Sequence, residues 1–156
     1  MAIINSREVL DKVRSFPLRS FAEGERVISQ ATATGRLLFL NEGAVDIGLE
    51  DTFIARVAEP GAVFGDLAYL LDQPHTATVT AVQPSSLYVV EDPEAFLEAE
   101  PKVAIYVARI LARRLNAVNH LLVETRRRVA DTDQRRGVLT ETLDRIGRAL
   151  QTYGTK

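Results

Sequence analysis

The stretch FGDLAYLLDQPHTATVTAV, residues 64–82, combines three local signals that together decide the fold. It opens with a glycine, an acid and a short apolar run, which predicts a tight turn into a short helix. A proline and His75 follow, and the run then alternates Thr with Ala or Val, which predicts a β-strand. The first N–H groups of a helix lack intrahelical acceptors and attract an anion. The stretch therefore predicts either an anion-binding cradle or, more simply, a glycine that only makes a tight turn.

The sequence on either side of this stretch reads as short strands separated by turns. Glycines at 24, 35, 43 and 61 stand at the breaks, where a positive φ costs little. The expected strands, each an alternating or compact apolar run, are ERVISQ (25–30), RLLFL (36–40), AVDIGL (44–49), TATVTAV (76–82) and SLYVV (86–90). This spacing predicts an antiparallel roll or barrel. An N-terminal helix over residues 6–15, with Ser6 as its N-cap, is expected to precede the strands.

The pattern changes after Pro101, where helical spacing begins and no further proline occurs. Apolar residues follow alternating steps of four and three, the rhythm of a coiled-coil seam. The predicted seam consists of Ala104, Ala108, Leu111, Leu115, Val118 and Leu122. The same register continues to residue 153 and admits one helix of about 50 residues, whereas the polar run DTDQRRG (131–137) favours two helices. In both cases the apolar stripe needs a partner, which predicts a homodimer.

The order of these elements resembles that of the cyclic nucleotide-binding domains. The resemblance rests on FAEGERVISQATATGRLLFLNEGAVDI (21–47), IARVAEPGAVFGD (54–66), residues 64–82 and LYVVEDPEAFLEAEPKVAIYVARILARRL (87–115), and it covers about residues 17–120. It implies a mainly β fold with flanking α-helices, an eight-stranded, jelly-roll-like β-roll with an N-terminal helix and a long C-terminal helix. Catabolite-activator-like members carry a DNA-binding domain after that helix. Here residues 1–124 are expected to form the sensor, and residues 125–156 are too few for such a domain and are expected to form a helical extension.

The resemblance also implies a ligand site. In the family a cyclic nucleotide lies inside the roll, and residues 64–82 are similar to its phosphate-binding cassette. Leu67 and Ala68 are expected to offer backbone N–H groups to the phosphate of cAMP or cGMP, and Asn119 on the long helix is expected to approach the base. The full expected set is Phe64, Gly65, Asp66, Leu67, Ala68, His75, Thr76, Ala77 and Asn119.

The cassette departs from the family pattern at two positions. Asp66 stands where a glutamate usually bonds the ribose hydroxyl, so the reach is shorter by one methylene. His75 stands where an arginine usually pairs with the phosphate, and a neutral imidazole offers one donor and no charge. Three interpretations stay open: weak phosphate binding helped by protonation, a different ligand, or a site that binds no nucleotide.

Composition narrows the remaining function classes. The chain has no cysteine, two histidines and a formal net charge of -2, which excludes thiol catalysis and disulfides and gives no global attraction to nucleic acid. No phosphate loop, nucleophile elbow or metal-ligand cluster is present. No stretch has the length of a membrane helix or a signal peptide. The sequence predicts a cytoplasmic, noncatalytic ligand sensor without cofactor, metal or DNA partner, signalling through its C-terminal helix. The alternative is a degenerate dimerisation or protein-interaction module.

Overall fold

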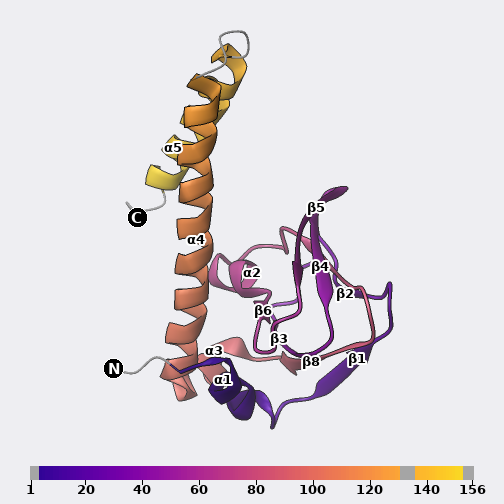
Figure 1. The fold of residues 1–156 in the computed structure, drawn as a ribbon. Helices are drawn as coiled ribbons and strands as arrows, with labels where there is room; N and C mark the ends of the chain where they lie inside the picture. Colours follow the sequence, from indigo (N-terminus) through magenta and orange to yellow (C-terminus); the bar gives the residue numbers. More distant parts are fainter. Residues whose placement is uncertain (1–3, 131–135, 153–156) are drawn as a thin grey trace. The chain divides into compact units, whose positions relative to one another are not determined.

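The computed structural model describes residues 4–130 and 136–152 of the chain (Figure 1). The chain divides into two compact units, Met1–Ala108 and Arg109–Lys156. The first unit contains all the strands of the described residues. The second contains most of the C-terminal helical segment. The predicted domain boundary after residue 124 stays a prediction.

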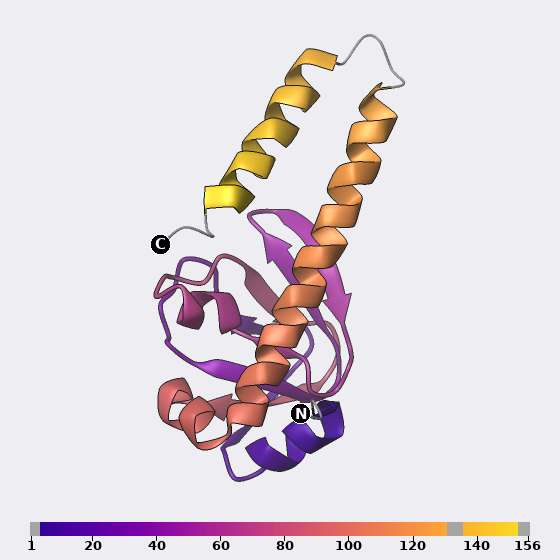
Figure 2. The same cartoon turned by 90° about the vertical axis from the view of Figure 1, so that its left-hand side faces the viewer.

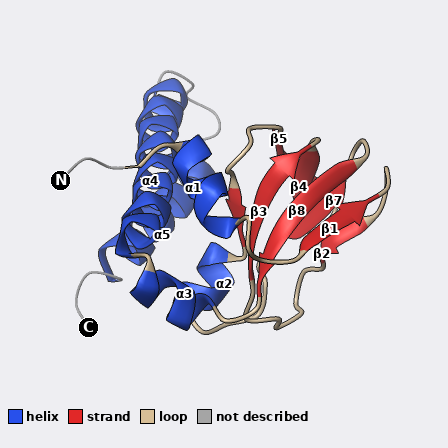
Figure 3. Cartoon of the chain, turned by 90° about the horizontal axis from the view of Figure 1, so that it is seen from below, coloured by secondary structure: helices blue, strands red, loops and turns tan. Residues whose placement is uncertain are grey.

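The first unit is built on eight described strands in two four-stranded sheets, in which every neighbouring pair is antiparallel. The first sheet has the order β1 (Leu18–Phe21), β8 (Ser85–Val90), β3 (Leu37–Glu42) and β6 (Val63–Phe64). The second has the order β2 (Arg26–Ile28), β7 (Thr78–Ala81), β4 (Val45–Leu49) and β5 (Thr52–Val57). The strands lie together, and α1 (Ser6–Val13) and α3 (Pro93–Ala99) lie to one side of them (Figure 3). The predicted eight-stranded β-roll is confirmed.

Side chains from both sheets fill the inside of the roll. Leu38, Leu40 and Phe64 from the first sheet pack in one cluster with Val45 and Val79 from the second. Because neighbouring residues of a strand point to opposite faces, Phe39 lies on the other side of β3. This explains why RLLFL is a continuous apolar run: the strand that it forms is buried on both faces.

A layer of helices covers the outer face of the first sheet. Phe39 meets Phe96 of α3 (Pro93–Ala99) edge-on, with 6.3 Å between ring centroids, and Phe96 meets Phe16 at 5.0 Å. Val103 and Val107, at the start of the long helix, are also buried. The aromatic contacts therefore fix the helical layer on the sheet that leads into the cassette.

The N-terminal helix α1 (Ser6–Val13) begins at a different cap from the predicted one. The side-chain oxygen of Asn5 accepts from the N–H of Glu8 at 3.1 Å, and the Glu8 carboxylate accepts from the N–H of Asn5 at 2.8 Å. This reciprocal capping box requires an acid three residues after the cap. Ser6 has Val9 at that position, so the prediction of Ser6 as the N-cap is wrong.

Two helices follow Pro101 within the described residues, α4 (Pro101–Ala130) and α5 (Arg136–Thr152). Figure 2 shows α5 beside the later part of α4, and the Arg126 guanidinium donates to the Asp144 carboxylate at 2.7 Å. In one straight helix these two residues would lie about 27 Å apart. The two-helix alternative is therefore confirmed, with residues 131–135 outside the description. Within the described ranges no helix is both long enough and apolar enough to cross a membrane.

Candidate functional site

The cassette starts at Gly65, which ends β6 and caps the short helix α2 (Asp66–Leu70) with a φ of +84°. A Cβ atom at this position would lie 2.4 Å from the carbonyl oxygen of Arg36. Both the backbone conformation and the close contact require glycine. Gly65 therefore allows the start of α2 to pack directly against the backbone of the segment that precedes β3.

The first turn of α2 presents the N–H groups that the sequence predicted. The intrahelical ladder begins with the N–H of Tyr69, which donates to the Gly65 carbonyl at 3.0 Å. The N–H groups of Leu67 and Ala68 precede that bond, in the positions that have no acceptor within a helix. Ala68 is buried, whereas the Leu67 side chain is 44% exposed. Asp66, the first residue of the helix, is 4% exposed, so its carboxylate lies inside the protein surface.

His75 closes the cassette and is bound to the loop between β2 and β3. Its backbone N–H donates to the Thr32 carbonyl at 2.9 Å, and its carbonyl accepts from the Ala31 N–H at 2.8 Å. Its ring Nε2 lies 2.7 Å from the Thr34 hydroxyl. The residue is 5% exposed. Sequence reasoning missed Thr34, and only the run of small polar residues ATATG (31–35) marks the loop as able to pack closely.

Burial lowers the pKa of the His75 imidazole below its usual value near 6.5. The ring is therefore neutral at pH 7, and its Nε2 already has a hydrogen-bond partner. This favours a ring that holds the cassette in place over a protonated substitute for arginine. Phosphate binding by a cationic His75 would require the buried ring to gain a proton.

The structure brings together one part of the predicted ligand set. The ring atom Cε1 of His75 lies 3.5 Å from the Cβ position of Gly65, so the two ends of the cassette meet. Phe64 is buried in the core cluster, Thr76 is exposed and Ala77 is partly buried. Asn119 is exposed on α4 in the second unit, and its approach to the base stays a prediction.

The charge of the cassette is negative. Residues 64–77 include Asp66 and Asp72 and contain neither lysine nor arginine. The arginine in backbone contact with the cassette is Arg36, whose guanidinium forms an ion pair with Glu91 at the end of β8. Sequence reasoning missed Arg36 as well, because the residue stands outside the cassette and no spacing rule links the two.

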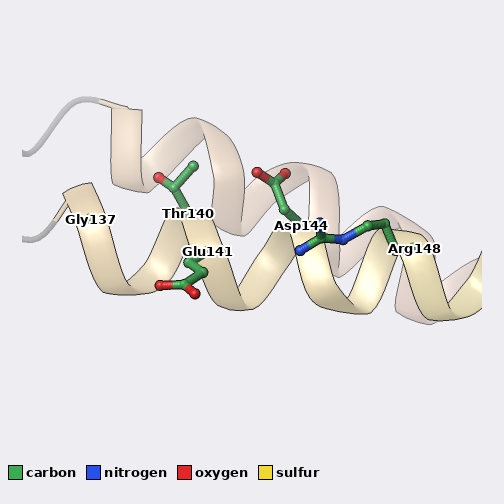
Figure 4. A pocket seen from close by; sticks show the side chains of 5 residues that line it. All are labelled: Gly137, Thr140, Glu141, Asp144 and Arg148. Atoms are coloured by element: carbon green, nitrogen blue, oxygen red, sulfur yellow. The ribbon is translucent and has the colours of Figure 1, made fainter.

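Other hollows lie away from these residues. One of about 260 Å³ lies over the second sheet and is lined by polar residues that include Arg26, Asp46 and Thr80. Another of about 530 Å³ runs along α5, lined by Gly137, Thr140, Glu141, Asp144 and Arg148 (Figure 4). Neither contains a residue of the predicted ligand set. Among the described residues, no group of three or more His, Cys, Asp or Glu is placed to hold a metal ion.

Comparison with known proteins decides the family. Residues 18–99, just over half of the chain, match the model of the cyclic nucleotide-binding domain. The chain belongs to this family. A domain of this family is a regulatory, ligand-sensing fold, and the resemblance seen in the sequence is confirmed.

Similar proteins place the domain in several kinds of longer chain. The Pycsar effector protein XpPycTIR of Xanthomonas perforans is 30% identical over 131 residues, which are 81% of this chain and 43% of that protein. The chain spans less than half the length of the curated relatives that it matches. The catabolite activator protein of Thermus thermophilus has a TM-score of 0.64 at 24% identity, covering 94% of this chain and 84% of that one. A protein from a cyclic-GMP-dependent signalling pathway that regulates bacterial phytopathogenesis has a TM-score of 0.61 at 23% identity, covering 74% and 98%. These two structures support the fold.

Proposed function

We propose that the protein senses a cyclic nucleotide, with cAMP and cGMP as the first ligands to test, and that it holds the cyclic phosphate at the start of α2. The observation that carries this proposal is the seat of Gly65 on the Arg36 carbonyl, which leaves no room for a side chain. The α2 helix starts at this contact, and the N–H groups of Leu67 and Ala68 precede its first intrahelical bond, where an anion is favoured. In this role Asp66 bonds the ribose and Thr76 offers a hydroxyl beside the phosphate.

Binding is expected to be weak because the cassette carries His75 in place of arginine. The charge-assisted bond of an arginine to a phosphate contributes about 1.5–3 kcal/mol, and the proposal assigns no such bond to His75, whose ring lies on Thr34. Since about 1.4 kcal/mol corresponds to tenfold in affinity, the loss is roughly tenfold or more. In the proposal His75 acts by positioning the cassette on Thr34 while its ring stays neutral.

The output of the sensor is proposed to be α4. The Tyr106 hydroxyl on α4 donates to the carbonyl of Gly61 at 3.2 Å, and Gly61 lies just before β6 and the cassette. The start of the helix is thus tied to the segment that enters the ligand site. A ligand that favours one packing of this segment shifts the population of α4 positions. The helix is also the proposed homodimer contact, because Leu115 and Val118 of the predicted coiled-coil seam are 48% and 49% exposed within the chain.

In this proposal the domain is noncatalytic and cytoplasmic, and it acts on an output partner whose chemistry the chain does not specify. The enzymatic and regulatory activities of its longer relatives belong to those proteins. DNA binding is not part of the proposal, because the sequence of residues 125–136 mixes arginines with acids, a pattern typical of a solvated face.

A second candidate function is a module that no longer binds nucleotide and serves dimerisation or protein interaction. The observation that favours it is the His75 side chain, which is buried and satisfied by Thr34. A site whose key polar side chain already has a partner has less to offer a phosphate.

Calorimetric titration separates the two functions. The wild-type protein is titrated with cAMP, cGMP, cCMP and cUMP at pH 7.5, beside Gly65→Ala and the matched control Gly24→Ala. Both glycines have a positive φ of similar size, but a Cβ at Gly24 meets nothing within 4 Å. We expect saturable binding by the wild type and the control and its loss in Gly65→Ala. No heat with any of the four ligands would refute the sensor and favour the interaction module.

A further inference from the structure

The ligand proposed for the cassette is an anion, yet the cassette offers it no cation. Within residues 64–77 the formal charge comes from Asp66 and Asp72, and His75 is held neutral by burial. Neither of these acidic side chains supplies the positive charge that attracts a phosphate. A site that binds a cyclic phosphate in this protein therefore needs a positive charge from a neighbouring segment.

The loop between β2 and β3 is that neighbour, because it contacts both ends of the cassette. At one end, Ala31, Thr32 and Thr34 bond to His75. At the other end, the Arg36 carbonyl lies against Gly65. The segment from residue 31 to 36 reads ATATGR, so Arg36 is its one charged residue.

The strand register extends the inner face of the roll to Arg36. Leu38 pairs with Val89 and with Phe64, and all three belong to the core inside the roll. Residues two apart along a strand point to the same face, so Arg36 and Glu91 continue this inner face beyond the ends of β3 and β8. The backbone of Arg36 touches Gly65, so the long side chain of Arg36 begins beside the first turn of α2.

The present ion pair of Arg36 with Glu91 opposes a rotation of the Arg36 side chain only weakly. Its Nε donates to the Glu91 carboxylate, with both side chains partly exposed at 36% and 51%. Exposed ion pairs contribute little to stability. Glu91 also lies 3.9 Å from a guanidinium nitrogen of Arg19 on β1, so the carboxylate keeps a cationic neighbour when Arg36 leaves.

We propose that Arg36 supplies the positive charge to the cyclic phosphate, exchanging Glu91 for the ligand. The assignment rests on the proposed function of the cassette and names the residue that takes the place of its missing arginine. Glu91 competes with the ligand for the guanidinium and so sets the affinity from outside the site.

The test is a titration of four variants with the cyclic nucleotide that the wild type binds best, at low and at physiological salt. Arg36→Gln removes the charge, and Arg36→Lys keeps the charge but loses the planar fork. Arg19→Gln is the matched control, because it removes the other cation beside Glu91. Glu91→Gln removes the competitor. Thermal melting of each variant confirms that it folds.

We expect Arg36→Gln to weaken binding by about tenfold or more and to flatten the dependence of affinity on salt. Arg36→Lys is expected to retain part of the affinity, Arg19→Gln to change it by less than about twofold, and Glu91→Gln to tighten binding. A folded Arg36→Gln variant with wild-type affinity would overturn the role of Arg36 and leave the sensor standing. A wild type that binds no cyclic nucleotide would overturn both.

Discussion

Replacing Thr34 with valine removes the hydroxyl that bonds the buried ring of His75 and keeps the side-chain volume almost unchanged. The bond is 2.7 Å long, and His75 is 5% exposed. A neutral hydrogen bond contributes about 0.5–1.5 kcal/mol, and leaving a buried polar group unsatisfied costs about 1–3 kcal/mol. Because the Thr34 side of the contact is exposed to water, we expect a loss near the lower limit, about 1–2 kcal/mol of the free energy of unfolding.

The assay is urea unfolding of the wild type, Thr34→Val, His75→Leu and the double variant at pH 7.5. The four proteins form a double-mutant cycle, which measures the interaction energy between positions 34 and 75. When position 75 is leucine, Thr34→Val can no longer leave a histidine ring nitrogen without a partner. We expect a coupling of about 1 kcal/mol between the two positions. A coupling below about 0.3 kcal/mol would refute the idea that Thr34 holds the cassette through His75.

The same variants give a prediction for pH. Burial lowers the folded-state pKa of His75, so between that value and the unfolded value near 6.5 the unfolded chain binds more protons. The contribution of neutral His75 is therefore fully present above about pH 6.5 and is lost as the pH falls through the folded-state pKa. Unfolding at pH 7.5, 6.0 and 5.0 should show a steeper loss of stability in the wild type than in His75→Leu. Equal slopes would contradict a buried, neutral ring.

Three further predictions test the ligand, the helix and the core. His75→Arg should tighten cyclic nucleotide binding by roughly tenfold in calorimetry, since it restores a charge-assisted bond, and an unchanged affinity would favour the interaction module. Leu115→Asp should shift the protein from dimer to monomer in sedimentation velocity. The control His120→Asp, at an exposed position of α4 outside the seam, should leave the dimer intact. Equal sedimentation of both variants would contradict the proposed dimer contact. Phe96→Ala should lower the free energy of unfolding by about 3–5 kcal/mol, because the ring packs against both Phe16 and Phe39, whereas Phe53→Ala at a 61% exposed ring should cost less than about 0.5 kcal/mol in the same assay.

Local sequence signals predicted five of the eight described strands, whereas the eight-stranded roll followed from the resemblance to the family. Glycine at each break and β-branched residues between the breaks reflect backbone requirements that act within a few residues. The N-cap of α1 could not be predicted from local residue preferences alone. Both Asn5 and Ser6 have the chemistry of a cap, and only the carboxylate of Glu8 decides between them.

The partners of the cassette could not be predicted in the same way. Thr34 lies 41 residues from His75, and Arg36 contacts Gly65 through its backbone, so neither relation has a repeating spacing. The Arg36 contact accompanies the pairing of β3 with β6, and the Thr34 contact joins the loop before β3 to the segment after α2, so both are properties of the folded chain. The pattern left open whether Gly65 begins an anion cradle or makes only a tight turn, and the fold was needed to show which loop packs against the cassette.

The break between α4 and α5 could be predicted only as one of two alternatives. A steady apolar register over residues 104–153 admitted one long helix, while the polar run around 131–137 argued for a break. The ion pair between Arg126 and Asp144 decides the question, because it needs the two segments side by side. Such a contact between two helices leaves no trace in the period of the sequence.

The most direct test of the cassette as a phosphate site is to follow its backbone amides by NMR during titration with a cyclic nucleotide. If Leu67 and Ala68 donate to the phosphate, their N–H resonances should shift saturably and by more than those of the control residues Gly24 and Ala130. Saturable heat without a shift at Leu67 and Ala68, or no change anywhere at millimolar ligand, would contradict the claim that the first turn of α2 binds the ligand.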